Sequence, residues 1–326
     1  MTEQSRIQQG FQTLKQHISQ QVLGQELLVD RLLIALLADG HLLIEGAPGL
    51  AKTRAIKVLS EGIEGDFHRV QFTPDLLPAD LTGTDIFRPQ DGSFQFQRGP
   101  LFHNLVLADE VNRAPAKVQS ALLEAMAERQ ITVGTTTYPL PEVFLVMATQ
   151  NPIEQEGTYP LPEAQLDRFL LHIKVGYPKQ ETEQLILRLA RMEAMRQGAG
   201  VAPGAPKLSL ETLLAARQEV LAVHMADNLE RYLIEIIFAT RKGSAYGAKL
   251  GNWIQWGASP RATIALDRCA RAHAWLAGRD YVGPEDIQTM AYDVLRHRLV
   301  LTYEAEAAGH TPDNLIENLI QLIPVP

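Results

Sequence analysis

The sequence has very little cysteine, few aromatic residues and no long apolar run. Cys269 is the single cysteine among 326 residues, so no internal disulfide can form, and we expect a reducing cytoplasm. Cys269 lies among alanines at helical spacing, which predicts a packed thiol rather than a nucleophile. No apolar run approaches membrane-spanning length, and the stretch from Met1 to Ser5 lacks signal-peptide character, so we expect no membrane insertion.

Positive charge is also scarce. Lysine and arginine number 30 against 38 aspartates and glutamates, which gives a formal net charge of −8. A general nucleic-acid-binding protein needs a basic face, so this balance argues against that class. What the chain does contain is 46% hydrophobic residues, which is enough for two domains with cores of their own.

The most informative stretch is a glycine-containing loop that follows the apolar run at residues 42–44 and leads into a helical pattern. Such a loop surrounds phosphate oxygens with backbone N–H groups. Lys52 would place a positive charge between the outer phosphates of ATP, and the Thr53 hydroxyl would bind Mg²⁺. The candidate phosphate-binding residues are Gly46, Ala47, Pro48, Gly49, Leu50, Ala51, Lys52, Thr53 and Arg54.

Ala51 stands where this motif usually has its second glycine. Because Ala51 adjoins the helix start, we expect right-handed dihedrals there, which alanine adopts without strain. Gly46 and Gly49 are expected to need backbone conformations that a Cβ would oppose. Taken alone, the loop is also consistent with an ordinary Gly/Pro-rich turn before a helix.

Two further apolar runs end in polar residues. Asp109 and Glu110 follow the run at 105–108, which fits a buried parallel strand whose carboxyl end reaches a site. Asp109 would hold Mg²⁺, and Glu110 would act as general base on the attacking water. Asn151 follows the run at 146–148 and could hold a water near the terminal phosphate. By itself such a run is more often an ordinary strand end; the loop upstream favours the site.

The pattern along the chain predicts an α/β core followed by a helical domain. Two helices over residues 5–38, broken near 22–25, precede strands at 42–45, 69–72, 105–108 and 143–148, with helices at 52–61 and 116–127 between them. Turn signals predict two hairpin insertions, at about 84–98 and 129–138. Beyond Pro178 only helices are indicated, at 179–197, 209–224, 228–241, 260–277, 284–296 and 312–323. We therefore expect a nucleotide-binding core over 1–178 and a helical lid over 179–326, with a flexible loop at about 197–207.

Taken in order, these motifs resemble those of the AAA+ ATPases. The amino-acid sequences of the individual motifs resemble those of the MoxR-type family. The resemblance covers nearly the whole chain from about Val22. The matching segments lie at residues 46–53, 71–80, 109–114, 119–126, 148–152, 161–169, 257–261, 278–282 and 294–298.

The resemblance implies a P-loop ATPase core with a parallel sheet, two β-hairpin insertions facing a central pore, and an all-α lid. It also implies a ring, usually a hexamer. Asn151 would then be the first sensor, Arg168 the arginine finger that reaches a neighbour's nucleotide, and Arg261 the second sensor. The resemblance further implies an adenine pocket near Val22, Leu23, Gly24 and Gln25.

The family's work is chaperone-like assembly or activation of client proteins, commonly with a von Willebrand factor A-type partner, which for this chain would be a separate protein. The alternative function is a motor or loader acting on nucleic acid. Arg88 and Arg98 of the first insertion are offset by Asp85 and Asp91, whereas a nucleic-acid contact needs a basic cluster, so the protein remodeller is favoured. A non-hydrolysing scaffold is disfavoured by Glu110. Phe87, Phe94 and Phe96 of the first insertion are either client contacts or the apolar face of a packed hairpin.

Overall fold

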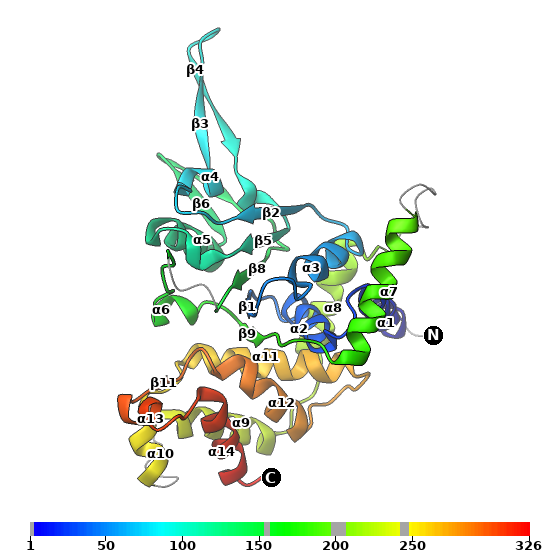
Figure 1. The fold of residues 1–326 in the computed structure, drawn as a ribbon, viewed down its shortest axis with the longest axis vertical. Coiled ribbons are helices and arrows are strands. Elements are labelled where there is room, and N and C mark those ends of the chain that lie inside the picture. The colour runs from blue at the N-terminus through cyan, green and yellow to red at the C-terminus, as the bar shows by residue number, and fades with distance from the viewer. Residues whose placement is uncertain (1–2, 153–156, 197–206, 242–247) are drawn as a thin grey trace. The chain divides into compact units, whose positions relative to one another are not determined.

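The computed structural model describes residues 3–152, 157–196, 207–241 and 248–326 (Figure 1). Residues 197–206 of the expected flexible loop therefore lie outside the described part. The chain separates into two compact units, and the division at 178/179 stays a prediction about domains. The first unit comprises Met1–Leu33, Leu42–Pro160 and Ile173–Leu214, and the second comprises Ile34–His41, Leu161–His172 and Ala215–Pro326.

A five-stranded sheet in the order β2-β5-β8-β1-β9 organises the α/β part, as expected. The ladders β2–β5, β5–β8 and β8–β1 are parallel. Strand β9 follows Phe169 and is missing from the predicted strands. The strands are β1 (Leu42–Glu45), β2 (Phe67–Gln71), β5 (Leu105–Asp109), β8 (Leu145–Gln150) and β9 (Leu171–Lys174).

The burial of each strand follows from its place in the sheet. Every side chain of β5 is buried, and so is nearly all of β8, because parallel strands in the centre of a sheet are covered on both faces. Strand β2 lies at the edge, where His68, Arg69 and Gln71 are exposed. The register places Gln71 opposite Asp109, so polar side chains of β2 adjoin the carboxyl end of β5.

Five longer helices accompany these strands. Gly24, with φ +75°, separates α1 from α2, so the break expected near residues 22–25 is confirmed. Helix α3 begins at Lys52, directly after the glycine-containing loop. Short helices occur at α4 (Pro78–Thr82) and α6 (Glu163–Leu166). The longer helices are α1 (Glu3–Gln21), α2 (Glu26–Leu37), α3 (Lys52–Glu61), α5 (Ala116–Glu128) and α7 (Gln180–Arg196).

Both predicted hairpins are present. Strands β3 (Gly83–Arg88) and β4 (Ser93–Arg98) form a long ribbon that extends away from the sheet (Figure 1). Strand β6 (Gln130–Val133) pairs with β7 (Thr136–Pro139). The three phenylalanines of β3–β4 differ in environment. Phe96 stacks on Tyr138 of the second hairpin with ring centroids 4.2 Å apart. Phe87 and Phe94 contact each other, yet are 52% and 69% exposed.

The second unit is mainly helical. Its core includes Trp275 and Cys269, so the prediction of a packed thiol is confirmed. The expectation of helices alone beyond Pro178 was wrong, because β10 (Ile254–Trp256) and β11 (Val300–Leu301) form a small antiparallel sheet. No helix in the described ranges is both long and apolar enough to cross a bilayer. The C-terminal helices are α8 (Leu210–Ala222), α9 (Asp227–Arg241), α10 (Ala248–Trp253), α11 (Pro260–Leu276), α12 (Pro284–Leu295), α13 (Tyr303–Ala307) and α14 (Pro312–Leu322).

Candidate nucleotide-binding site

The glycine-containing loop connects β1 to α3. Gly46 donates its N–H to the Gln150 carbonyl at 3.2 Å, and a Cβ on Gly46 would lie 2.7 Å from the Val175 carbonyl oxygen. Close approach therefore requires glycine at position 46. Gly49 requires it for another reason, since its φ of +82° is left-handed. Lys52 returns to the loop and donates from Nζ to the Gly46 carbonyl at 2.5 Å.

Ala51 does not have the conformation that we expected. As N-cap of α3 it has φ +58° and ψ +17°, which is left-handed, so the interpretation that right-handed dihedrals suffice there was wrong. The helix begins only at the next residue, Lys52. A left-handed alanine costs about 1–2 kcal/mol, which a glycine would avoid.

A pocket of about 400 Å³, here called the P-loop pocket, brings most of the predicted site residues together. It joins a cation from the loop to the acids at the end of β5. Gly46 and Ala47 do not line it, and Ala47 is buried. The lining residues are Pro48, Gly49, Leu50, Ala51, Lys52, Thr53, Arg54, Arg69, Gln71, Asp109, Glu110, Thr149 and Asn151.

Lys52 provides the central positive charge of this pocket. Burial lowers the pKa of Lys52, while the nearby carboxylates of Asp109 and Glu110 act in the opposite direction. A bound triphosphate would add negative charge and favour the protonated amine further. The site is therefore suited to an anion that replaces the water around this amine.

The two acids have different partners. Thr149 donates its hydroxyl to Asp109 Oδ1 at 2.6 Å, and Arg69 donates to Oδ2 from Nη2 at 2.7 Å and from Nε at 3.1 Å. The Thr149 hydroxyl also accepts the backbone N–H of Glu110 at 2.9 Å. One threonine on β8 thus orients both acids of β5.

Glu110 has a left-handed backbone, with φ +57°, which turns the chain sharply away from β5. Its Oε2 accepts hydrogen bonds from Gln71 Nε2 at 2.7 Å and from Arg113 Nη1 at 3.0 Å. Arg69 also donates to the Gln71 side-chain oxygen at 3.2 Å. A continuous set of contacts therefore links Asp109 to Glu110 through Arg69 and Gln71.

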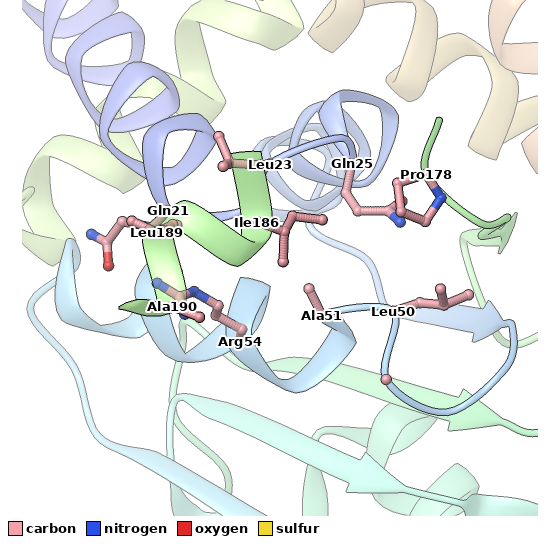
Figure 2. A pocket seen from close by; sticks show the side chains of 11 residues that line it. Gln21, Leu23, Gln25, Leu50, Ala51, Arg54, Pro178, Ile186, Leu189 and Ala190 are labelled. Carbon is pink, nitrogen blue, oxygen red and sulfur yellow. The ribbon is translucent and has the colours of Figure 1, made fainter. Parts of the chain in front are cut away.

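A second hollow adjoins the loop on the side of α7 and is here called the α7 slot (Figure 2). Leu23 and Gln25 of the predicted adenine-binding segment line it, whereas Val22 is buried. Gln25 Nε2 donates to the Gly176 carbonyl at 3.3 Å, which orients the amide. The slot is lined by Gln21, Leu23, Gln25, Gly49, Leu50, Ala51, Arg54, Pro178, Ile186, Leu189 and Ala190.

Arg54 lines both hollows and connects α3 to α7. Its guanidinium makes a two-pronged contact with the Glu193 carboxylate, with Nη1 to Oε2 at 3.0 Å and Nη2 to Oε1. The hydrogen bond to Glu193 is the main reason that the pKa of Arg54 is raised. Arg54 Nε is buried and has no acceptor among the residues that the structure describes.

The two predicted arginines lie outside both hollows. Arg168 and Arg261 belong to the second unit. The Arg261 side chain is 60% exposed and lies 3.8 Å from the Asp167 carboxylate. Asp167 also accepts from Ser259 Oγ at 2.9 Å and from Arg298 Nε at 2.7 Å, so it ties the Arg168 segment to the start of α11.

Sequence reasoning assigned no role to Arg69, Gln71 or Thr149, although all three line the P-loop pocket. The sequence pattern around these three residues gave only a weak signal for a role in the site. Thr149 adjoins the polar end of β8, and Arg69 is a charged residue inside a short strand pattern. Their proximity to the acids depends on strand order and register, which the sequence does not state.

The donor set fits a magnesium-bound triphosphate. Lys52 and the loop N–H groups suit phosphate oxygens, and the Thr53 hydroxyl and Asp109 carboxylate are the oxygen ligands that Mg²⁺ prefers. The mainly apolar α7 slot, which Gln25 also lines, suits a flat polar-edged base.

This arrangement is that of the P-loop class of nucleotide-binding proteins. The chain is 49% identical over 310 residues to "Chaperone MoxR1" of Mycobacterium tuberculosis, covering 94% of this chain and 79% of the relative. It is 34% identical to "Protein MoxR" of Paracoccus denitrificans, covering 94% and 93% of the two chains. The chain belongs to the MoxR family of AAA+ ATPases.

Other comparisons agree with this assignment. Residues 41–171 match the "ATPase family associated with various cellular activities (AAA)", and residues 252–319 match the "AAA lid domain". A crystal structure from Cytophaga hutchinsonii is similar with a TM-score of 0.91 and 46% identity, covering 99% of this chain and 97% of that chain. The predicted AAA+ core and helical lid are thereby confirmed.

Proposed function

We propose that this protein hydrolyses ATP with Mg²⁺ in the P-loop pocket. The observation that carries the proposal is the meeting of Lys52 with Asp109 and Glu110 in one pocket, from loop and strand segments far apart in sequence. Lys52 binds the outer phosphates, Thr53 and Asp109 bind Mg²⁺, and Glu110 accepts a proton from the attacking water. Asn151 holds that water, and the α7 slot takes the adenine.

Two substitutions separate binding from chemistry. Lys52→Ala removes the charge that binds the phosphates, so a fluorescent ATP analogue should no longer bind. Glu110→Gln removes only the base, so binding should persist while turnover falls by about 10²-fold or more. Lys57→Ala, at an exposed position of the same helix, is the matched control and should change neither. Hydrolysis by Glu110→Gln at the unaltered rate would show that the assigned base is wrong.

We further propose that the chain assembles into a ring, as a hexamer. The ring remodels client proteins in the cytoplasm together with a separate von Willebrand factor A-type protein. The exposed Phe87 and Phe94 on the β3–β4 hairpin support a protein client over a nucleic acid. Retention of clients and adaptor by Glu110→Gln in the presence of ATP, and release by Lys52→Ala, would be the expected pull-down result.

In this proposal residues 1–178 form the nucleotide-binding core and residues 179–326 form the lid, with α7 of the latter range contributing to the α7 slot. Arg168 acts on the nucleotide of the neighbouring subunit, and Arg261 responds to the bound phosphate. The role of Arg168 needs a neighbouring subunit. Measuring turnover against protein concentration tests this, because activity that requires a ring rises as rings form.

A further inference from the structure

Asp109 has both of its carboxylate oxygens engaged by side chains of this chain. Thr149 donates to Oδ1, and two nitrogens of Arg69 donate to Oδ2. The carboxylate is only 12% exposed, so the Arg69 contact lies in a partly desolvated place where a charge pair counts for more than at the open surface. Thr149 brings no charge, so among the described residues Arg69 is the cation in direct contact with this acid.

A divalent cation bound by Asp109 would need the same carboxylate. A metal ion and a guanidinium on one oxygen repel each other, so each weakens the binding of the other. Arg69 is 50% exposed and lines the P-loop pocket, and its side chain is therefore able to turn away from Asp109 without leaving the pocket. The other anion that this pocket is suited to hold is the triphosphate.

We propose that Arg69 is a positioning residue that competes with the divalent cation for Asp109 and transfers its charge to the nucleotide phosphates when metal-bound ATP enters. This inference rests on the proposed function for the phosphate step, whereas its metal step concerns Asp109 alone. The exchange keeps charge balanced: the cation replaces the guanidinium on Asp109, and the guanidinium pairs with the added phosphate charge. As a result the metal binds weakly without nucleotide and more tightly with it.

The edge position of β2 makes this exchange possible. Arg69 stands across from Leu107 in the β2–β5 register, two residues before the acid, and its long side chain reaches along the sheet to the carboxyl end of β5. A central strand would bury this side chain between helices. Because β2 has one neighbouring strand in the part of the chain that the structure describes, Arg69 can be exposed while its backbone stays in the sheet.

The first experiment measures Mn²⁺ affinity of the nucleotide-free protein from the electron paramagnetic resonance signal of the free ion. Arg69→Met removes the competing charge and should tighten Mn²⁺ binding about tenfold, the size expected for one charge-assisted contact. Arg69→Lys keeps the charge but cannot donate twice to Oδ2, so its affinity should lie between the two. Asp109→Asn combined with Arg69→Met should abolish the gain, which locates the metal at Asp109.

Arg88→Met is the matched control, because it removes the same charge from an exposed position of β3 outside the pocket. Its Mn²⁺ affinity should equal that of the unaltered protein. Equal Mn²⁺ affinities for the unaltered protein, Arg69→Met and Arg69→Lys would overturn the inference. Circular dichroism of each variant verifies folding, and Arg69→Lys keeps the test decisive if Arg69→Met is unstable.

The second experiment measures binding of a fluorescent ATP analogue in saturating Mg²⁺, where the cation has displaced Arg69 from Asp109. Under this condition Arg69→Met should bind the analogue about tenfold more weakly than Arg88→Met, because the phosphates lose the guanidinium. Unchanged binding would overturn the phosphate step. If the unaltered protein fails to bind the analogue even with Mg²⁺, the proposed function falls and the phosphate step with it, while the Mn²⁺ result still decides the competition at Asp109.

Discussion

At the scale of single residues, Ala51 shows how a loop can retain its shape with an unfavourable residue. Its left-handed backbone is followed at once by the helix that carries Lys52 and Thr53. The surrounding contacts of the loop hold this conformation against the steric cost of the Cβ. The left-handed backbone of Ala51 is therefore a strained conformation next to the candidate phosphate site.

Ala51→Gly should leave stability unchanged or raise it by up to about 1 kcal/mol. Glycine removes the left-handed strain but adds freedom to the unfolded chain, and the two effects nearly offset each other. Ala55→Gly, at a right-handed and fully buried position of the same helix, should instead destabilise by about 1 kcal/mol or more. Urea unfolding of both variants compares them, and equal losses would contradict the assigned strain.

Asp286 is a second residue whose surroundings are decisive. Burial alone would raise its pKa, but hydrogen bonds from His273, Arg279 and the Gly283 N–H outweigh that effect and lower the pKa to about 2. The folded state thus stabilises the ionised form of the Asp286 carboxyl group. This network joins α11 to the start of α12.

The sign of the resulting pH dependence follows from the lowered pKa. The folded value of about 2 lies below the ordinary value of 3.8, so the stabilisation is complete above about pH 4 and is lost as the pH falls toward 2. Its size is on the order of 2 kcal/mol. Asp286→Asn should flatten the free energy of unfolding over this window, whereas Glu285→Gln, on an exposed neighbour, should retain the slope.

At the scale of elements, the β3–β4 hairpin combines two kinds of surface. Phe96 lies against Tyr138 and Phe102 near its base, and Phe87 and Phe94 pair toward its end. The sequence left open whether these side chains contact clients or pack on the core. The structure divides them: Phe96 packs, and the other two are exposed.

Phe94→Ser should change stability by no more than about 0.5 kcal/mol, since its side chain is mostly solvated. Phe96→Ser should cost about 1–3 kcal/mol because it removes a stacked ring from the base of the hairpin. Thermal unfolding measures both. If the hairpin contacts clients, Phe94→Ser should also lower client release while basal ATP hydrolysis persists; equal melting shifts for the two variants would contradict the division.

The contact between α3 and α7 is also testable at this scale. Glu193→Gln removes the charge that binds Arg54, so the helix edge of the α7 slot is held less firmly. Both side chains are partly exposed, so we expect only about a two- to fivefold faster dissociation of a fluorescent ATP analogue. Glu183→Gln, exposed on the same helix, is the control for a general change of charge. An unchanged dissociation rate would show that the Arg54–Glu193 ion pair does not affect how long the nucleotide stays bound.

At the scale of the whole molecule, Glu110 and Arg168 belong to different units. If Arg168 completes the site of a neighbour, Glu110→Gln and Arg168→Ala should each hydrolyse ATP poorly, and Arg168→Ala should still bind it. A finger of this kind contributes about 10³–10⁵ in turnover. In a head-to-tail ring, random mixing of the two variants leaves about a quarter of the interfaces with both residues intact.

Mixed rings should therefore regain measurable activity that neither variant has alone. Steady-state ATP hydrolysis of the mixture checks this, with subunit exchange established by fluorescence transfer between labelled subunits. Rings that exchange subunits but stay inactive would rule out the role of Arg168 between subunits, and so would full activity in a dilute monomeric sample.

The sequence by itself determined the α/β class and most helices and strands, because these depend on local periodicity. It also determined the loop, acids and asparagine of the candidate site, because these belong to motifs with one main chemical use. It missed β9 and the β10–β11 sheet, which are short and gain their stability from neighbours rather than from their own pattern. Only tertiary structure decided that Ala51 is left-handed, that Phe96 packs while Phe94 is exposed, and that Arg69 and Gln71 meet the acids. Those outcomes depend on strand order, register and long-range contacts, which bring together residues that no local pattern connects.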